Sequence, residues 1–216
     1  VARQAATFSS DQKICGGQRA RVVALGGDHS LTYACARPYL QEFGERLALI
    51  NLDAHLDVRT VKPGEAFNSG TGFGRLLDAG LKHYTVAGVR DFQTSPAYVK
   101  RVEDADGQIV TVAKINVKGA EAAARAILNT IPGDCEAIYL SVDMDVADAS
   151  VAPGVSAPTP GGLLAHQLLD MVRVISADHR LIAADIMELA PNLEESGSDR
   201  TARLAAACFA YLISGF

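Results

Sequence analysis

The sequence predicts an α/β fold in which helices cover both faces of a mostly parallel sheet. Short apolar runs rich in β-branched residues recur along the chain, and stretches that favour helix lie between them. The runs are continuously apolar, which is typical of strands buried on both faces. Regular alternation of strand and helix is typical of parallel sheets. These three observations define the expected fold class.

The expected elements follow one another in a simple order from the N-terminus. Strands are expected at 21–25 (RVVAL), 47–53, 84–90, 108–115, 137–145 and 181–189. Helices are expected at 30–43, 70–79, 95–104, 119–130, 163–176 and 199–212. No internal repeat, low-complexity segment or linker interrupts this order, so one domain over residues 1–216 is the economical interpretation.

Composition narrows the class of protein. The 216 residues are 49% hydrophobic, which is enough for one sizeable core. A net charge of −5 without any basic run argues against a nucleic-acid partner. No apolar run is long enough to cross a membrane, and the polar start lacks the apolar core of a signal peptide. Four widely spaced cysteines predict free thiols in the reducing cytoplasm.

Candidate metal ligands follow three of the expected strands. They are His29 in GGDHS, Asp53, His55 and Asp57 in DAHLD, and Asp143 and Asp145 in SVDMD. Residues two apart on an extended chain project the same way, and the carboxyl ends of parallel strands form one ligand-binding edge. Oxygen and nitrogen ligands without thiolates suit Mn²⁺ or a similar dication, and this number of ligands suits two ions. Taken singly, each motif has an alternative: a bare glycine turn, a polar strand face or an ordinary acidic loop.

Taken together, these motifs resemble the binuclear manganese ureohydrolases, the family of arginase, agmatinase and formimidoylglutamase. The resemblance runs from GGDHS to the C-terminal helix and includes APGVSAP (152–158) and DIMELAP (185–191). It implies a three-layer α/β/α sandwich that lacks the N-terminal part usual in the family. The sequence leaves open whether that part is absent or merely missing here.

The resemblance also implies roles for the ligands. The first of two Mn²⁺ ions would be held by His29, Asp53, Asp57 and Asp143. The second would be held by His55, Asp53, Asp143 and Asp145, so that Asp53 and Asp143 bridge the two ions. Glu188 would pair with the amidinium group of a substrate, and Asp57 would also carry a proton to the leaving nitrogen.

Three details favour the formimidoylglutamase branch of the family. One is the APGVSAP segment. Another is FNSGTGF (67–73), which resembles that branch's SGTPF loop and implies substrate contacts for Asn68 and Ser69. Ser69 stands where arginase and agmatinase have a proton-shuttling histidine. The third is Arg59, whose planar fork suits a substrate carboxylate. DIMEL and GVRD (88–91) look closer to arginase, so the branch stays open.

The sequence therefore predicts hydrolysis of the linear amidine N-formimidoyl-L-glutamate, an intermediate of histidine degradation, to L-glutamate and formamide. One alternative is an arginase- or agmatinase-type hydrolase of a guanidino compound. Another is a metal-binding homologue without activity. By analogy with the family, we expect a homo-oligomer, a trimer or hexamer, with a small-molecule partner and neither nucleic acid nor membrane.

Overall fold

A six-stranded parallel sheet forms the centre of the computed structural model, which describes residues 13–14, 18–19, 21–62 and 64–214. The strand order is β3-β8-β7-β4-β5-β6, and every neighbouring pair is parallel. The strands are β3 (Val22–Leu25), β4 (Leu47–Leu52), β5 (His83–Val89), β6 (Gln108–Thr111), β7 (Ala137–Asp143) and β8 (Leu181–Met187). The expected parallel sheet is confirmed. A short antiparallel pair, β1 (Lys13–Ile14) with β2 (Gln18–Arg19), was not expected.

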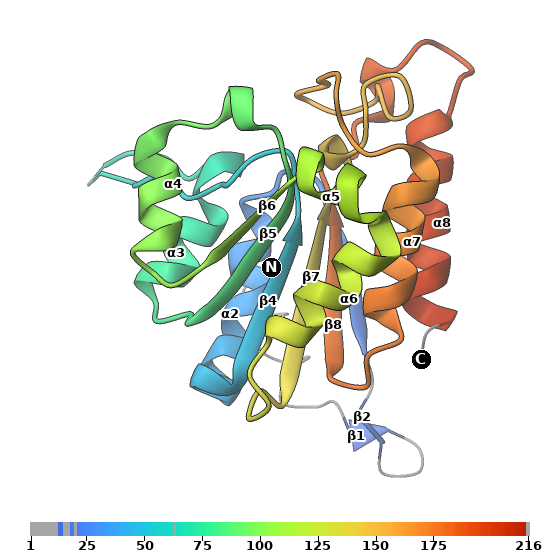
Figure 1. The fold of residues 1–216 in the computed structure, drawn as a ribbon. Coiled ribbons are helices and arrows are strands. Elements are labelled where there is room, and N and C mark those ends of the chain that lie inside the picture. Colours follow the sequence, from blue (N-terminus) through green and yellow to red (C-terminus); the bar gives the residue numbers. More distant parts are fainter. Residues whose placement is uncertain (1–12, 15–17, 20, 63, 215–216) are drawn as a thin grey trace.

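Helices cover the sheet on both faces (Figure 1). One face carries α2 (Leu31–Phe43), α3 (Gly72–Asp78) and α4 (Pro96–Glu103). The other carries α5 (Val112–Lys118), α6 (Ala120–Thr130), α7 (Ala165–Ser176) and α8 (Arg200–Ser214). The three-layer α/β/α sandwich is thereby confirmed.

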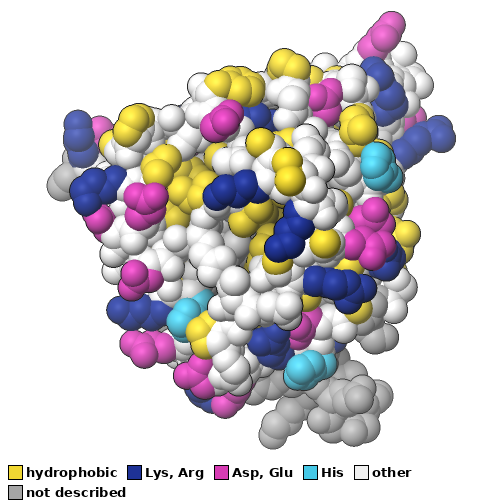
Figure 2. Space-filling model, in the orientation of Figure 1, with side chains coloured by type: hydrophobic (Ala, Val, Ile, Leu, Met, Phe, Trp, Pro, Cys, Tyr) yellow, Lys and Arg dark blue, Asp and Glu magenta, His cyan; other side chains and the backbone are white. Residues whose placement is uncertain are grey.

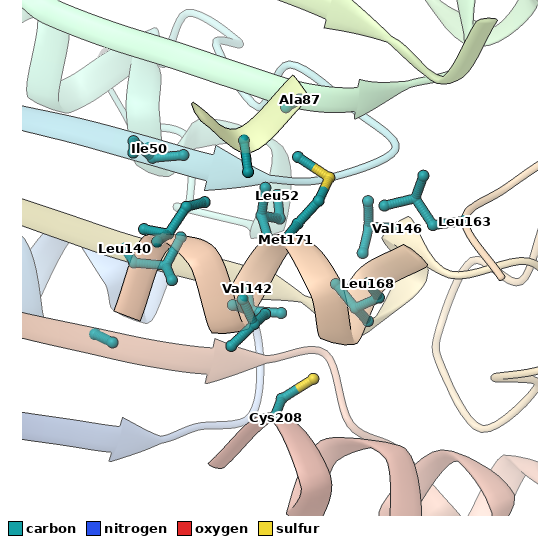
Figure 3. Close-up of a cluster of buried hydrophobic side chains, with 14 of the residues drawn as sticks. Ile50, Leu52, Ala87, Leu140, Val142, Val146, Leu163, Leu168, Met171 and Cys208 are labelled. Carbon is teal, nitrogen blue, oxygen red and sulfur yellow. The ribbon is translucent and has the colours of Figure 1, made fainter. Parts of the chain in front are cut away.

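Strand β4 shows why the apolar runs are continuous. All of its residues are buried, because alternate side chains enter different cores. Leu47 and Leu49 pack among the helices of the α2 face. Ile50 and Leu52 pack on the other face, where Figure 3 shows them near Met171 of α7. Truncating such a side chain to alanine costs about 2–5 kcal/mol of stability.

The strand expected at 108–115 is wrong in its second half, which is helix α5. The side chain of Thr111 accepts a hydrogen bond from the backbone N–H of Lys114 at 3.3 Å and so caps the helix. Val112 and Ile115 are three residues apart and bury the same helical face. The helix ends at Gly119, whose φ of +85° is left-handed. An apolar run of this length is compatible with the two-residue period of a strand and with the 3.6-residue period of a helix. Here the Thr111 cap favours the helix.

The mixed surface charge and the free cysteines agree with what the composition predicts. On the face drawn in Figure 2, Lys and Arg side chains are interspersed with Asp and Glu. Among the described residues, Cys35, Cys135 and Cys208 are free thiols, as expected, and Cys15 lies outside that part of the chain. No helix in the described ranges has the length and apolar character needed to span a bilayer.

Candidate metal centre

The candidate ligands converge where the central strands end. His29 stands four residues after β3, Asp53 directly follows β4 and Asp143 is the last residue of β7. Glu188 directly follows β8. Since the strands are parallel, their carboxyl ends lie at one edge of the sheet.

One set of side chains, the first ligand group, surrounds His29. The ligand atoms of His29, Asp53, Asp57 and Asp143 all lie within 4.8 Å of one another. Nδ1 of the fully buried His29 lies 2.8 Å from Asp143 Oδ2, 3.1 Å from Asp57 Oδ2 and 3.4 Å from Asp53 Oδ2. This is the set that the family resemblance implied for the first ion.

A second ligand group consists of Asp53, His55 and Asp145. Nδ1 of His55 lies 3.1 Å from Asp145 Oδ2 and 3.5 Å from Asp53 Oδ1. Asp53 therefore offers one carboxylate oxygen to each group. Asp143, expected in both, lies only with the first: its Oδ2 faces His29, and its Oδ1 accepts the Asp145 backbone N–H at 2.8 Å. Bridging by Asp143 stays a prediction.

Backbone groups fix the carboxylates before any ion binds. Asp53 Oδ1 accepts the His55 N–H at 2.6 Å, and Asp145 Oδ1 accepts the Ala54 N–H at 3.3 Å. Gly88 of β5, at φ +102°, lets these turns come close, because a Cβ there would lie 2.2 Å from Val146 Cγ2 and 3.2 Å from the Asp53 carbonyl oxygen.

Asp57 has an unusual backbone. Its φ of +49° is left-handed, which costs a non-glycine residue about 1–2 kcal/mol. The Asp57 carbonyl accepts the N–H groups of Phe73 and Gly74 at the start of α3, both at 3.1 Å. The first turn of α3 thus holds Asp57 in the conformation that turns its side chain toward His29.

The acidic surroundings shift the pKa values of both histidines upward. Hydrogen bonds to Asp145 and Asp53 raise the pKa of His55 to about 11. Burial alone would lower the pKa of His29, but the neighbouring carboxylates raise it well above its usual range. Burial and the charge of Asp53 raise the pKa of Asp57 to about 7. The cluster attracts positive charge, which a dication would supply while displacing protons.

The residues present fit a pair of hard dications. His29 Nδ1 is buried, faces three carboxylate oxygens and makes no hydrogen bond of acceptable geometry with the described residues. Atoms that converge in this way are arranged as ligands around a point rather than as hydrogen-bonded pairs. Clustered buried carboxylates are costly unless a cation neutralises them, and imidazole with carboxylate suits Mn²⁺-like ions.

Glu188 lies directly beside the first ligand group. Its Oε1 accepts the His29 backbone N–H at 2.8 Å and its Oε2 accepts the Ser156 hydroxyl at 2.6 Å. Its φ is +63°, and its own N–H donates to the Gly27 carbonyl oxygen at 2.8 Å. The carboxylate is thus oriented by two donors in a strained backbone conformation, a combination that marks functional positions.

Three of the four expected substrate contacts, Arg59, Asn68 and Ser69, lie in the segment 58–71, which we call the substrate loop, and Glu188 is the fourth. Arg59 is exposed, packs over Gly70 and lines a small hollow together with His55 and Asp57. Asn68 uses its side-chain oxygen to accept the Gly70 N–H at 3.1 Å, which leaves its amide nitrogen for a ligand. Ser69 is half-buried at the start of the same short turn.

Sequence reasoning missed a buried cation beside the acidic cluster. Arg90 directly follows β5 and is only 2% exposed. Its Nη2 donates to the Ala147 carbonyl oxygen at 2.9 Å, while burial lowers the pKa of the guanidinium despite the nearby acids. The position of Arg90 in GVRD, at the end of an expected strand, could have indicated from the sequence that it lies near the ligands.

Ser141, Ser156 and Asp185 were also missed. Ser141 and Asp185 lie inside β7 and β8; the Ser141 hydroxyl lies 2.8 Å from His29 Nε2, and Asp185 accepts a hydrogen bond from that hydroxyl. A polar residue within an otherwise apolar buried strand was the signal that could have found them.

Comparison with known proteins agrees with this geometry. Residues 2–214 match the model of the Arginase family. A formimidoylglutamase of Halobacterium salinarum is 37% identical over 196 residues, covering 89% of this chain and 61% of that protein.

Solved structures show the same fold. The formimidoylglutamase of Bacillus subtilis superposes with a TM-score of 0.87 at 32% identity, over 99% of this chain and 66% of that one. A Trypanosoma cruzi formiminoglutamase with Mn²⁺ gives 0.88 at 26% identity, over 100% of this chain and 70% of that one. The fold, the two ligand groups and these matches lead to one conclusion: the chain belongs to the arginase family.

Proposed function

We propose that this protein hydrolyses N-formimidoyl-L-glutamate to L-glutamate and formamide with two bound Mn²⁺ ions. The observation that carries the proposal is the pair of ligand groups sharing Asp53, with Glu188 beside them. The formimidoylglutamases among its relatives and the Mn²⁺ in a related structure support it. Because the chain spans 61% of the first of these relatives, its activity and substrate are proposals.

Each of the two ions would be held by its own set of ligands. His29, Asp53, Asp57 and Asp143 would hold one ion, and Asp53, His55 and Asp145 the other, with Asp143 as a further bridge. When bound, the two dications supply an activated water for attack on the amidine carbon. The buried edge of the sheet supplies the ligands in a fixed arrangement, so little reorganisation accompanies binding.

Two side chains would bind and orient the substrate. Glu188, held by the His29 N–H and by Ser156, would pair with the amidinium nitrogens. Arg59, across the hollow that also reaches His55 and Asp57, would pair with a glutamate carboxylate. The amidine and the carboxylate of the substrate would thus each meet a side chain of opposite charge. Asn68 and Ser69 would complete the contacts by neutral hydrogen bonds.

Asp57 would move the proton. It faces His29 Nδ1 at 3.1 Å and also lines the hollow with Arg59. In the proposed site, Asp57 would therefore border both the activated water and the leaving nitrogen. We propose that an Asp57 carboxylate oxygen accepts a proton from the attacking water and passes it to the nitrogen of glutamate.

A substrate screen tests the proposal. The Mn²⁺-loaded protein is given formimidoylglutamate, arginine, agmatine and guanidinobutyrate, and glutamate with formamide is measured separately from urea. We expect formimidoylglutamate to be hydrolysed fastest. Preferred release of urea would move the assignment to the arginase or agmatinase branch. Two bound ions without turnover of any amidine would favour a non-catalytic homologue.

Glu188→Gln provides a mechanistic control. The amide has the same shape but no charge for the amidinium, so we expect kcat/KM to fall on the order of a hundredfold. Leu189→Met, at the next residue, is a matched control with the Glu188 carboxylate intact.

We also propose cytoplasmic localisation, supported by the three free thiols, and assembly into a trimer or hexamer. Sedimentation of the complete protein as a monomer would contradict the assembly.

A further inference from the structure

A buried chain of hydrogen bonds reaches the far side of the His29 ring. Nε2 of His29 lies 2.8 Å from the Ser141 hydroxyl. That hydroxyl donates to Asp185 Oδ1 at 2.5 Å, and the Tyr139 hydroxyl donates to Asp185 Oδ2 at 2.7 Å. His29, Ser141 and Asp185 are each 0% exposed, and Tyr139 is 1% exposed. All four side chains are therefore shielded from bulk solvent.

The number of protons in this series of hydrogen bonds decides which ring nitrogen of His29 carries a lone pair. Ser141 has one hydroxyl proton, and it gives this proton to Asp185. The Ser141 oxygen can therefore only accept from His29, which places the ring proton on Nε2. In the neutral form of the ring, the form that can ligate a cation, Nδ1 is then left with its lone pair toward the carboxylates of the first ligand group. This is the tautomer that can bind a metal.

The ring is also held from its side. Phe73 of α3 meets His29 edge to face, with 5.0 Å between ring centroids, and stacks on Tyr84 at 5.2 Å. Aromatic contacts of this kind restrict the ring plane. Both the orientation and the tautomer of His29 are therefore determined by groups that touch neither metal nor substrate.

We propose that Ser141, Asp185 and Tyr139 form a positioning relay that presents His29 Nδ1 to the ion of the first ligand group. The proposal rests on the proposed metal centre but not on the identity of its substrate. His55 has no such support: its side chain is 29% exposed, and within the described ranges its Nε2 makes no hydrogen bond. The relay should therefore act on one of the two ion positions only.

A purely structural role has a different consequence. If Ser141 only satisfied the buried Asp185 carboxylate, removing its hydroxyl would destabilise the fold and would affect both ion positions alike. Selectivity for the position that contains His29 therefore separates positioning from stability.

The experiment is a Mn²⁺ titration by calorimetry in two single-site backgrounds. In His55→Ala, which keeps the first ligand group complete, Ser141→Ala should weaken Mn²⁺ binding about 10- to 100-fold. In His29→Ala, where the relay has no ring to orient, the same change should alter the remaining affinity less than about twofold, because Ser141 bonds to His29 and Asp185, neither of which belongs to the second ligand group. Ser141→Thr keeps a hydroxyl and should restore most of the affinity.

A matched control and a fallback keep the test decisive. Ser176→Ala removes another buried serine hydroxyl, one that bonds only to its own helix, and should leave both affinities unchanged. If a background holds no Mn²⁺, the comparison is made in the unmodified chain, where Ser141→Ala should weaken one of the two binding steps. Equal weakening of both steps, unchanged affinity or no rescue by threonine would overturn the proposal. A protein that shows the selective loss without hydrolysing formimidoylglutamate would refute the proposed substrate alone.

Discussion

The ligand groups and the substrate loop lie side by side but are built in different ways. Asp53 and Asp143 stand at the ends of β4 and β7, and backbone N–H groups of the same turns orient their carboxylates. Arg59 and Asn68 lie on an exposed segment without a strand. The metal-binding edge inherits its geometry from the parallel sheet, whereas the substrate loop must be held by contacts of its own.

Val58 at the start of the loop is buried in the core, but other contacts of the loop lie at the surface. Arg101 of α4 donates to the Thr60 hydroxyl at 2.6 Å. The Arg75 guanidinium lies between the rings of Tyr33 and Phe67, 3.5 Å from each centroid. Contacts of this kind contribute about 0.5–1 kcal/mol each at exposed sites. Under the proposed function, the comparison implies that the metal chemistry rests on the sheet, while selection of the substrate rests on a segment outside it.

The largest expected effect comes from the shared ligand. Asp53→Asn should disturb both ion positions and lower kcat by more than about a hundredfold, since each dication stabilises the transition state by several kcal/mol. Asp145→Asn should affect mainly one position. Elemental analysis after Mn²⁺ loading checks this. If Asp53→Asn still retained two ions per chain, the shared role would be refuted.

Removing the metal should destabilise the fold itself. At an ion concentration about a thousandfold above Kd, binding adds about 4 kcal/mol to the free energy of unfolding. For a chain of this size, EDTA should therefore lower Tm by roughly 10 °C. Scanning calorimetry with and without EDTA measures the shift. An unchanged Tm would show that the acidic edge does not depend on cations.

Arg59→Ala should separate the two regions. Loss of a charged hydrogen bond to the substrate carboxylate should raise KM by an amount equivalent to about 1.5–3 kcal/mol. Bound Mn²⁺ should not change, because Arg59 belongs to the substrate loop. Lys62→Ala, an exposed cation of the same loop, is the matched control. Equal effects of the two substitutions would mean that Arg59 acts only through surface charge.

Ser69→Ala should have a smaller effect. A hydroxyl has no pKa near neutrality, so Ser69 cannot replace a proton-shuttling histidine by itself. Losing one neutral hydrogen bond should lower kcat by about tenfold or less. Steady-state kinetics with formimidoylglutamate give the value. A thousandfold loss would place Ser69 in the chemistry and contradict the assignment of proton transfer to Asp57.

The smallest effect concerns acid stability beside the site. The Ser150 hydroxyl and backbone N–H groups of residues 150, 161 and 162 lower the pKa of Asp148 to about 2. A lowered folded-state pKa stabilises above the unfolded value near 4, and this contribution is lost as pH falls toward 2. Allowing for solvent screening, Asp148→Asn should cost about 1 kcal/mol at neutral pH. Urea unfolding of the metal-free chain should show this difference disappearing between about pH 4 and pH 2; a constant difference would contradict it.

Much of the fold follows from local patterns. Continuous apolar runs predicted the six strands of the main sheet, and the alternation with helices predicted their parallel arrangement. Sequence alone did not separate helix α5 from β6, because Val112 and Ile115 fit both the strand period and the helix period. The Thr111 side chain, which caps the helix, marks the boundary in the structure. The pair β1–β2 carries no apolar periodicity of useful length.

The candidate ligands were identified from sequence because each follows a strand, and strand ends of a parallel sheet must meet. Only the tertiary structure decided how they meet. It placed Asp143 beside His29, buried Arg90 beside the cluster, and aligned Ser141 of β7 with Asp185 of β8 behind the His29 ring. The physical reason is that residue type and periodicity determine which element forms and which side chains can bind a cation. The partner of each side chain depends on strand register and on contacts between residues that lie from dozens to more than a hundred positions apart.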